Sequence, residues 1–112
     1  MAAADDSLLP ETVALLPREF EVEPGTGFRS LEEVRRFLIP RITALLDRKP
    51  ALLMSILYRI DVAEAEVQRV LATSPPRGLA SDLADLIIER QLVKARIRRQ
   101  YRSQPPDDTA TP

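Results

Sequence analysis

Cysteine and histidine are both absent from this chain of 112 residues. Without cysteine the chain can form no disulfide framework, no thiolate zinc site and no thiol nucleophile. Without histidine it lacks the side chain that most often acts as an acid–base group or a metal ligand at neutral pH. We therefore expect a protein that is not an enzyme and that needs no metal or other cofactor.

Aromatic residues are also scarce, at 4% of the chain, and tryptophan is missing. The core must then consist of Leu, Ile, Val and Ala, which favours packed helices over a β-sandwich. No apolar run approaches the roughly 18 residues that a membrane-spanning helix needs, and residues 1–10 hold two acids and no base, unlike a secretory signal. These absences predict a cytoplasmic protein with no membrane span, and the length suits one domain.

The net charge of −1 conceals an alternation of sign along the chain. Residues 1–24 carry a net −5, residues 25–60 a net +4, residues 61–89 a net −4 and residues 90–112 a net +4. Segments of opposite sign suit neighbours that pack against one another. The alternative is ordinary surface charge with no special order.

The first predicted helix starts near Ser30 and ends before the turn at residues 47–49. Ser30 and Glu33 have the spacing of a capping box, in which each side chain binds the other's free backbone N–H. Apolar residues then recur at three- and four-residue steps. Pro40 interrupts the helix without changing the apolar phase, so we expect a kink there rather than an end.

Further helices are predicted beyond this turn. Pro50 suits the first position of the second helix. Asp61 with Glu64 has the spacing of another capping box and predicts the start of a third helix, unless the second and third helices run on as one bent helix. Residues 73–78, which contain two prolines and a glycine, break the chain. The longest helix follows, from about residue 79 to residue 102.

The predicted fold is all-α: a small bundle of three or four helices whose first helix is kinked at Pro40 and whose C-terminal helix is long. Residues 29–102 form the helical domain. Residues 1–28 are expected to be an acidic, proline-containing flexible tail, because acid and proline density oppose independent folding. Residues 103–112 are expected to be a disordered C-terminal tail.

Five charged residues stand close to predicted core positions. They are Arg59, Asp61 and Glu64 at the junction of the second and third helices, and Arg90 and Lys94 within the last helix. An unpaired buried charge is costly, so we expect a structural ion-pair network that includes a partly buried pair between Arg90 and a carboxylate. A pocket for a small anion is the alternative, but no Gly-rich loop or helix N-terminus points to one.

The last helix carries a wider apolar face than one partner helix usually covers. Its predicted core stripe consists of Leu83, Leu86, Ile87, Val93 and Ile97. The second apolar edge consists of Ile88, Leu92 and Ala95. This second edge predicts a contact surface, and a homodimer through it is the first expectation.

The same helix ends in a basic stretch that includes Arg96, Arg98, Arg99 and Arg102. The helix macrodipole favours cations at a C-terminus, which explains the stretch without a ligand. The alternative is weak binding of nucleic acid or an acidic surface, which would weaken steeply with salt and which the acidic tail 1–24 would mask by folding back. An isoelectric point near 5.5 argues against that alternative.

Three acids, Asp82, Asp85 and Glu89, share one side of the last helix in its first half. Carboxylates alone can hold Mg²⁺ or Ca²⁺. Acids near a helix N-terminus are also favoured by the macrodipole, and no calcium-binding loop pattern is present. We expect a solvated face rather than a metal site.

Two strings in the chain resemble a known pattern: Tyr58-Arg59-Ile60-Asp61-Val62 followed by Glu64, and Leu86-Ile87 followed by Arg90 and Lys94. They resemble the paired "YRIDV-x-E" and "LI-x-x-R-x-x-x-K" strings of a family of short uncharacterised bacterial helical proteins. The resemblance spans residues 30–98 and implies a small helical bacterial protein, with no activity assigned.

The sequence as a whole predicts a non-catalytic protein–protein interaction or regulatory module. Its expected partner is a second copy of itself or another protein. Weak binding of nucleic acid or an acidic surface through the basic end of the last helix is the alternative.

Overall fold

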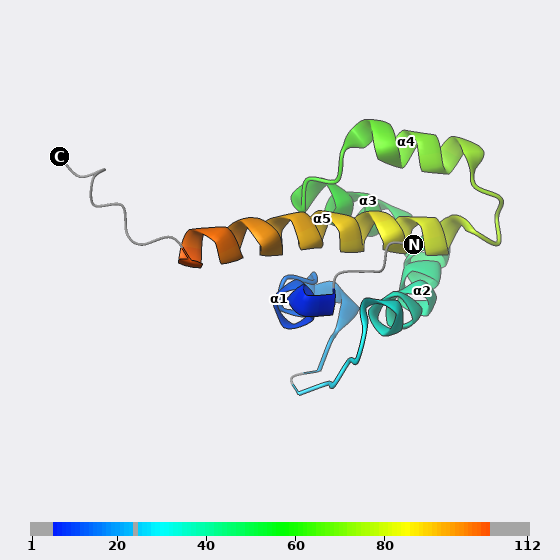
Figure 1. Cartoon of the computed structure of the whole chain (residues 1–112). Coiled ribbons are helices and arrows are strands. Elements are labelled where there is room, and N and C mark those ends of the chain that lie inside the picture. The colour runs from blue at the N-terminus through cyan, green and yellow to red at the C-terminus, as the bar shows by residue number, and fades with distance from the viewer. Residues whose placement is uncertain (1–5, 24, 104–112) are drawn as a thin grey trace.

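The computed structural model of the chain describes residues 6–23 and 25–103. Every regular element in them is helical, which confirms the all-α prediction (Figure 1). The elements are the 3-10 turns η1 (Asp6–Leu8) and η2 (Arg18–Phe20) and the helices α1 (Leu9–Ala14), α2 (Leu31–Arg48), α3 (Pro50–Arg59), α4 (Glu64–Thr73) and α5 (Leu79–Ser103). The long helix α5 crosses the molecule and packs against α1, α2 and α4, while α3 packs on α2. No described helix is long and apolar enough to cross a membrane.

Helix α2 begins where the sequence predicts. The Ser30 hydroxyl accepts a hydrogen bond from the Glu33 N–H at 3.2 Å, while the Glu33 carboxylate accepts from the N–H of Arg29 at 2.6 Å. The Ser30 half of the predicted capping box is therefore confirmed. The Glu33 carboxylate binds the N–H of Arg29 instead of the predicted N–H of Ser30. The helix continues through Pro40, whose exposed position leaves the carbonyl one turn earlier open to water.

Helix α3 begins with Pro50 at its first position, as predicted, and ends in a Schellman motif. The Asp61 N–H donates to the Tyr58 carbonyl at 3.0 Å, and the Val62 N–H donates to the Leu57 carbonyl at 3.1 Å. Asp61 has a φ of 66°, in the left-handed region. Asp is one of the few residues other than Gly that adopt this region readily, which is why it can end the helix here.

The prediction that Asp61 is the N-cap of the next helix is therefore wrong. Helix α4 begins at Glu64, and Ala63, which precedes it, makes no side-chain cap hydrogen bond. The alternative of one bent helix is also excluded, because the chain leaves helical geometry between α3 and α4. Asp suits both an N-cap and a left-handed C-terminal position, and here the second role holds.

The core lies between the first half of α5 and the helices α2, α3 and α4. In the first half of α5 the fully buried side chains are Leu83, Ala84 and Ile87. They meet Val34, Leu38 and Ile42 of α2, Leu53 and Ile56 of α3, and the nearly buried Val67 and Val70 of α4 in one apolar cluster. Burial of about this many aliphatic side chains is the main source of stability in a domain of this size.

Residues 6–23 belong to the fold, which corrects the expectation of a flexible tail over residues 1–28. Leu8, Leu16 and Phe20 are buried, with Phe20 fully so. The prolines that suggested disorder occupy places where no N–H is needed: Pro10 lies in the first turn of α1, and Pro17 directly precedes η2. Residues 1–5 lie outside the described residues.

Polar contacts also tie this segment to α2. The Leu31 N–H at the start of α2 donates to Asp6 Oδ1 at 2.9 Å, and the Arg41 side chain donates to the Phe20 carbonyl at 2.9 Å. Of the predicted C-terminal tail, residues 103–112, only Ser103 is described, and it is the last residue of α5.

Candidate functional site

The ion pairs between residues far apart in the chain each join segments of opposite net charge. Among the described residues they are Glu11–Arg99, Glu19–Arg59, Arg35–Asp85 and Asp61–Arg90. Each acidic segment, 1–24 and 61–89, thus contacts both basic segments. The alternation of charge along the sequence corresponds to real pairing between neighbours in the fold.

The five residues of the predicted ion-pair network do not form one cluster. Arg59 pairs with Glu19 instead, through two hydrogen bonds of 2.9 and 2.6 Å between its guanidinium and the carboxylate. This hydrogen bonding lowers the pKa of Glu19 and raises the pKa of Arg59. Glu64 is exposed and lies within ion-pair distance of no described cation. The sequence did not indicate this contact, because Glu19 lies in a segment that was expected to be flexible.

Arg90 and Asp61 form the part of the network that does come together. Their closest nitrogen and oxygen atoms are 4.0 Å apart, and the Arg90 side chain is 34% exposed. Arg90 Nε also donates to the carbonyl of Ile60 at 3.2 Å. The guanidinium therefore ties the end of α3 to α5 at the surface rather than neutralising a buried charge, and exposed pairs of this kind contribute little stability.

Lys94 lies one turn beyond Arg90 in a region with an excess of positive charge. Its pKa is lowered, first because burial removes water from the ammonium and next because Arg90 and Arg98 repel the charge; Asp61 opposes the shift. Arg90, Lys94 and Arg98 follow one another at four-residue steps, so they lie along one side of α5. This row of cations has a single nearby acid, Asp61, among the groups that act on Lys94.

The predicted dimer interface, Ile88, Leu92 and Ala95, is covered within the chain itself. Ile88 is 7% exposed and Ala95 is fully buried, while Leu92 is half-buried against the core. Ile88 and Leu92 line a shallow hollow together with Leu31 of α2. The prediction of a contact surface for a second copy at these side chains is therefore corrected, because α2 and the N-terminal segment already occupy that side of α5.

A different apolar stripe on α5 is open to solvent. Val93 and Ile97, which the sequence placed in the core, are 38% and 47% exposed, and Tyr101 is 75% exposed. Their four-residue spacing sets the three side chains on one side of the helix. We call them the open stripe.

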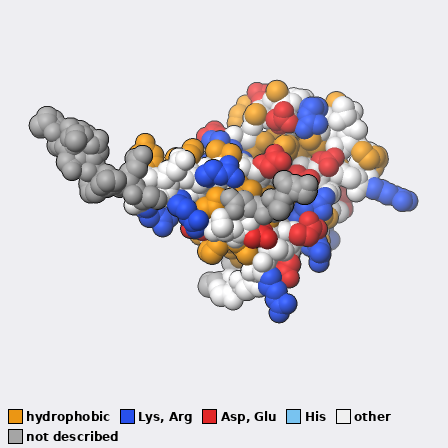
Figure 2. Space-filling model, in the orientation of Figure 1, with side chains coloured by type: hydrophobic (Ala, Val, Ile, Leu, Met, Phe, Trp, Pro, Cys, Tyr) orange, Lys and Arg blue, Asp and Glu red, His pale blue; other side chains and the backbone are white. Residues whose placement is uncertain are grey.

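The open stripe runs into the C-terminal part of α5, which extends past α3 and α4 (Figure 1). Figure 2 shows Lys and Arg side chains gathered over this projecting part, with hydrophobic side chains between them. The row of Arg90, Lys94 and Arg98 runs alongside the stripe. Apolar and cationic side chains thus share one solvent-exposed surface.

The four predicted polyanion contacts do not share one face. Arg99 pairs with Glu11 and donates to the Ser7 carbonyl at 3.0 Å. Arg98 and Arg102 border a shallow hollow against α1. Arg96 lies about 200° around the helix from Arg98, because each residue turns an α-helix by about 100°. The four predicted residues therefore do not form one continuous basic face, although Arg98 and Arg102 lie on the same side of α5.

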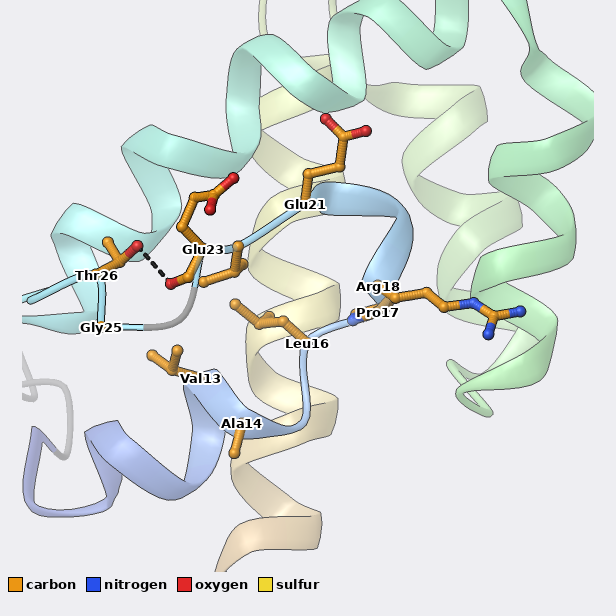
Figure 3. A pocket seen from close by; sticks show the side chains of 10 residues that line it. Val13, Ala14, Leu16, Pro17, Arg18, Glu21, Glu23, Gly25 and Thr26 are labelled. Atoms are coloured by element: carbon orange, nitrogen blue, oxygen red, sulfur yellow. Dashed lines mark hydrogen bonds between the residues drawn. The ribbon is translucent and has the colours of Figure 1, made fainter.

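A hollow of about 390 Å³ lies between the end of α1 and the loop that follows η2 (Figure 3). Val13, Leu16 and Pro17 give it an apolar lining. In Figure 3 the Arg18 side chain points away from it, and the Thr26 hydroxyl is bonded to the Glu23 carbonyl at 2.7 Å. The hollow thus lacks the convergent polar groups that orient a substrate.

Two of the three acids on this side of α5 are used in structural contacts, whereas Glu89 is exposed and pairs with no described cation. Asp85 pairs with Arg35 at 2.8 Å, and Asp82 accepts a hydrogen bond from the Ser74 hydroxyl at 2.5 Å. In residues 6–23 and 25–103, no group of three or more acids is placed to hold a metal ion. The Asp85 contact raises the pKa of Arg35.

Comparison with known proteins identifies no relative of this chain. The sequence matches no protein-family model and is significantly similar to no curated protein and no solved structure. The resemblance of the two strings to a bacterial family stays a prediction. The structure does explain much of the first string, since residues 58–62 end α3 in the Schellman motif.

Proposed function

We propose that this protein is a non-catalytic interaction module that binds an acidic, amphipathic helix of a partner protein on the open stripe of α5. The observation that carries the proposal is the exposure of Val93, Ile97 and Tyr101 at four-residue spacing on the projecting half of α5. Exposed apolar side chains that line up on one helix face suit the apolar face of a second helix.

Charge supports an acidic partner. Arg90, Lys94 and Arg98 run beside the open stripe, and Asp61 is the acid that partly offsets them at Lys94. A partner helix with carboxylates flanking its apolar residues would supply the missing negative charge. Complementary charge of this kind speeds association and selects the partner more than it adds affinity.

The same charge argues against a second copy as the occupant. In a two-fold pairing of α5 with α5 through the open stripe, Lys94 and Arg98 of one copy would approach the same cations of the other. Like charges brought together across an interface cost free energy and disfavour the pairing. A protein of different charge therefore fits the surface better than a homodimer does.

Nucleic acid is the alternative that the surface favours less. Phosphates need cations but make no use of an apolar stripe. Arg96 and Arg98 lie on different sides of the helix, and Arg99 is already paired with Glu11. This alternative becomes an outcome of the test below.

The test uses the full chain and three fluorescent probes: a synthetic helical peptide with Leu at every fourth position and Glu between, its counterpart with Lys in place of Glu, and mixed-sequence DNA. Anisotropy is measured at low and at physiological salt. Saturable binding of the Glu peptide alone supports the proposal. Ile97→Ser should weaken that binding by about tenfold, because it removes an apolar contact.

The matched control is Leu71→Ser, which removes an aliphatic side chain of similar exposure, 41%, from α4. It should leave the affinity unchanged. Tighter binding of DNA than of the Glu peptide, lost in Arg98→Gln and kept in Ile97→Ser, would establish the nucleic-acid alternative. Binding of no probe, or equal losses in the two Ser variants, would overturn the proposal.

A further inference from the structure

A second face of α5, on the opposite side of the helix from the open stripe, is covered by the N-terminal segment. Gln91, Ala95 and Arg99 lie at four-residue steps, so they share one side of the helix. Gln91 Nε2 donates to the Leu15 carbonyl, and Arg99 pairs with Glu11. Ala95, fully buried between them, faces the same segment. We call residues 6–15, which comprise η1, α1 and Leu15, the cover.

The contact between the cover and α5 leaves buried polar atoms without partners. Among the described residues, the buried side-chain atoms that find no hydrogen-bond partner are Glu11 Oε1, Thr12 Oγ1 and Gln91 Oε1. All three belong to this one contact. A buried polar atom left unpaired costs free energy that a well-packed apolar contact does not. The cover is therefore held less firmly than its burial alone would indicate.

The cover also has few apolar anchors in the main core. Leu8 is buried outside the large apolar cluster, and Leu9 and Val13 pack against that cluster only partly buried, whereas Leu16 and Phe20, beyond the cover, belong to it. Helix α1 spans only six residues and is too short to persist without its neighbours. The hollow of Figure 3 lies along the flank of α1, at Val13 and Ala14.

A hinge is available where the cover meets the rest of the fold. Leu16 and Phe20 stay in the core, and the Arg41 side chain holds the Phe20 carbonyl. Pro17, with extended backbone between α1 and η2, separates this anchor from the cover. Rotation at this point would lift the cover from α5 and break its Asp6 contact with the Leu31 N–H, while the apolar contacts among α2, α3 and α4 stay in place.

We infer that the cover detaches from α5 as a unit while the rest of the fold stays intact, and that it competes internally with the acidic partner. The identity of the partner rests on the proposed function, whereas the detachment does not. Glu11 neutralises Arg99 and acts on Arg102 in the closed chain. Detachment takes the Glu11 carboxylate away from both cations. Arg102 continues, at a four-residue step, the row of Arg90, Lys94 and Arg98 that runs beside the open stripe, so the open chain binds an acidic helix more tightly.

Hydrogen exchange on the full chain tests the detachment. Amides of α1 should exchange through an opening that leaves the amides of α2 protected. Thr12→Val replaces the unpaired buried hydroxyl with a methyl of similar shape, so it should slow exchange in α1 by about tenfold. Glu11→Gln, which weakens the contact with Arg99, should speed it.

Thr43→Val is the matched control, because Thr43 is exposed on α2 and its hydroxyl is bonded to the Ile39 carbonyl at 2.8 Å. It should leave the exchange of α1 unchanged. Exchange of α1 at the same rate as α2, or the same response to both Thr→Val changes, would overturn the detachment.

The Glu peptide then tests the competition. Its affinity should rise in Glu11→Gln and fall in Thr12→Val, each in step with the exchange rate of α1. Altered exchange with unaltered affinity would refute the competitor role and leave the proposed function standing. Altered exchange with no peptide binding in any variant would refute the proposed function and leave the detachment standing.

Discussion

The two halves of α5 have opposite surroundings although they form one continuous helix. The first half is enclosed by α2, α3 and α4 through aliphatic side chains that are fully buried. The second half projects past α3 and α4, and its covered side meets α1 through polar groups, some of them unpaired. The comparison teaches that one helix can be a rigid core element at one end and a surface available to a partner at the other.

Charge divides the helix in the same way. Acids occupy the first half and cations the second, so each end of α5 carries the sign that the macrodipole favours there. Asp85 is engaged by Arg35 and Asp82 by Ser74, whereas Glu89 in the first half and Arg96 and Arg98 in the second have no ion-pair partner among the described residues. Most of the unpaired charge of α5 therefore lies on its second half.

The largest predicted effect compares the two halves directly by the same substitution. Ile87→Ala, in the fully buried half, should lower the free energy of unfolding by about 2–5 kcal/mol, because it removes aliphatic contacts and leaves a cavity. Ile97→Ala, ten residues later, should lower it by less than about 1 kcal/mol. Urea unfolding followed by far-ultraviolet circular dichroism measures both. Equal losses would show that the projecting half is packed like the first.

The next effect concerns Asp61, at the point where α3 ends against α5. Asp61→Val should cost about 1–2 kcal/mol, because a β-branched residue is strained at a φ of 66°. Asp61→Gly should be neutral or stabilising, since Gly adopts that region freely. The same urea unfolding compares them. A cost for Gly as large as that for Val would instead assign the role of this residue to its carboxylate.

Arg90, near the boundary between the halves, should matter less. Arg90→Met should cost about 1 kcal/mol, since the side chain gives up a hydrogen bond to the Ile60 carbonyl and a long, exposed contact with Asp61. A fully buried pair would instead cost about 3–5 kcal/mol when one partner is removed. A loss in that higher range would show that Arg90 belongs to the core half of α5.

The smallest effect is a pH dependence of the N-terminal segment. Hydrogen bonds from Arg99 and Arg59 lower the pKa of Glu11 and Glu19 from the ordinary value of 4.5. The folded chain then binds these protons less readily than the unfolded chain, so the contribution to stability is complete above pH 4.5 and is lost as the pH falls below it.

A variant with both Glu11→Gln and Glu19→Gln isolates that contribution. Its free energy of unfolding should fall less than that of the unmodified chain between neutral pH and about pH 3, near the lower end of ordinary carboxyl titration. Parallel losses in the two proteins would assign the acid sensitivity to other carboxylates.

Local signals in the sequence predict the helices well. Ser30 and Pro50 mark helix starts correctly, and residues 73–78 separate α4 from α5, because a cap hydroxyl or a proline acts on the backbone within a few residues. Asp61 shows the limit of such signals. An Asp side chain suits both an N-cap and a left-handed C-terminal position. The backbone φ distinguishes the two roles, and it is known only from the structure.

The candidate site was harder to predict because it depends on which neighbour covers each side of α5. Val93 and Ile97 have the spacing of a core stripe, but α4 lies alongside the first half of α5 and does not reach them. Ala95 is covered by a segment whose apolar anchors, among them Leu8, Leu9 and Val13, stand among acids and prolines that indicate disorder in the sequence. Gln91 is only 2% exposed. Hydrophobic periodicity assigns apolar residues to buried positions, so it does not predict that this polar side chain is buried.

The exposure of both tyrosines has a consequence for spectroscopy. Tyr58 is 70% exposed and Tyr101 is 75% exposed, and the chain has no tryptophan and no further tyrosine. The intrinsic fluorescence of the protein therefore arises at its surface, so melting of the core will change it little. Tyr101 belongs to the open stripe, so its emission should change when a partner binds there. Tyrosine fluorescence would then report binding of a partner but hardly report unfolding.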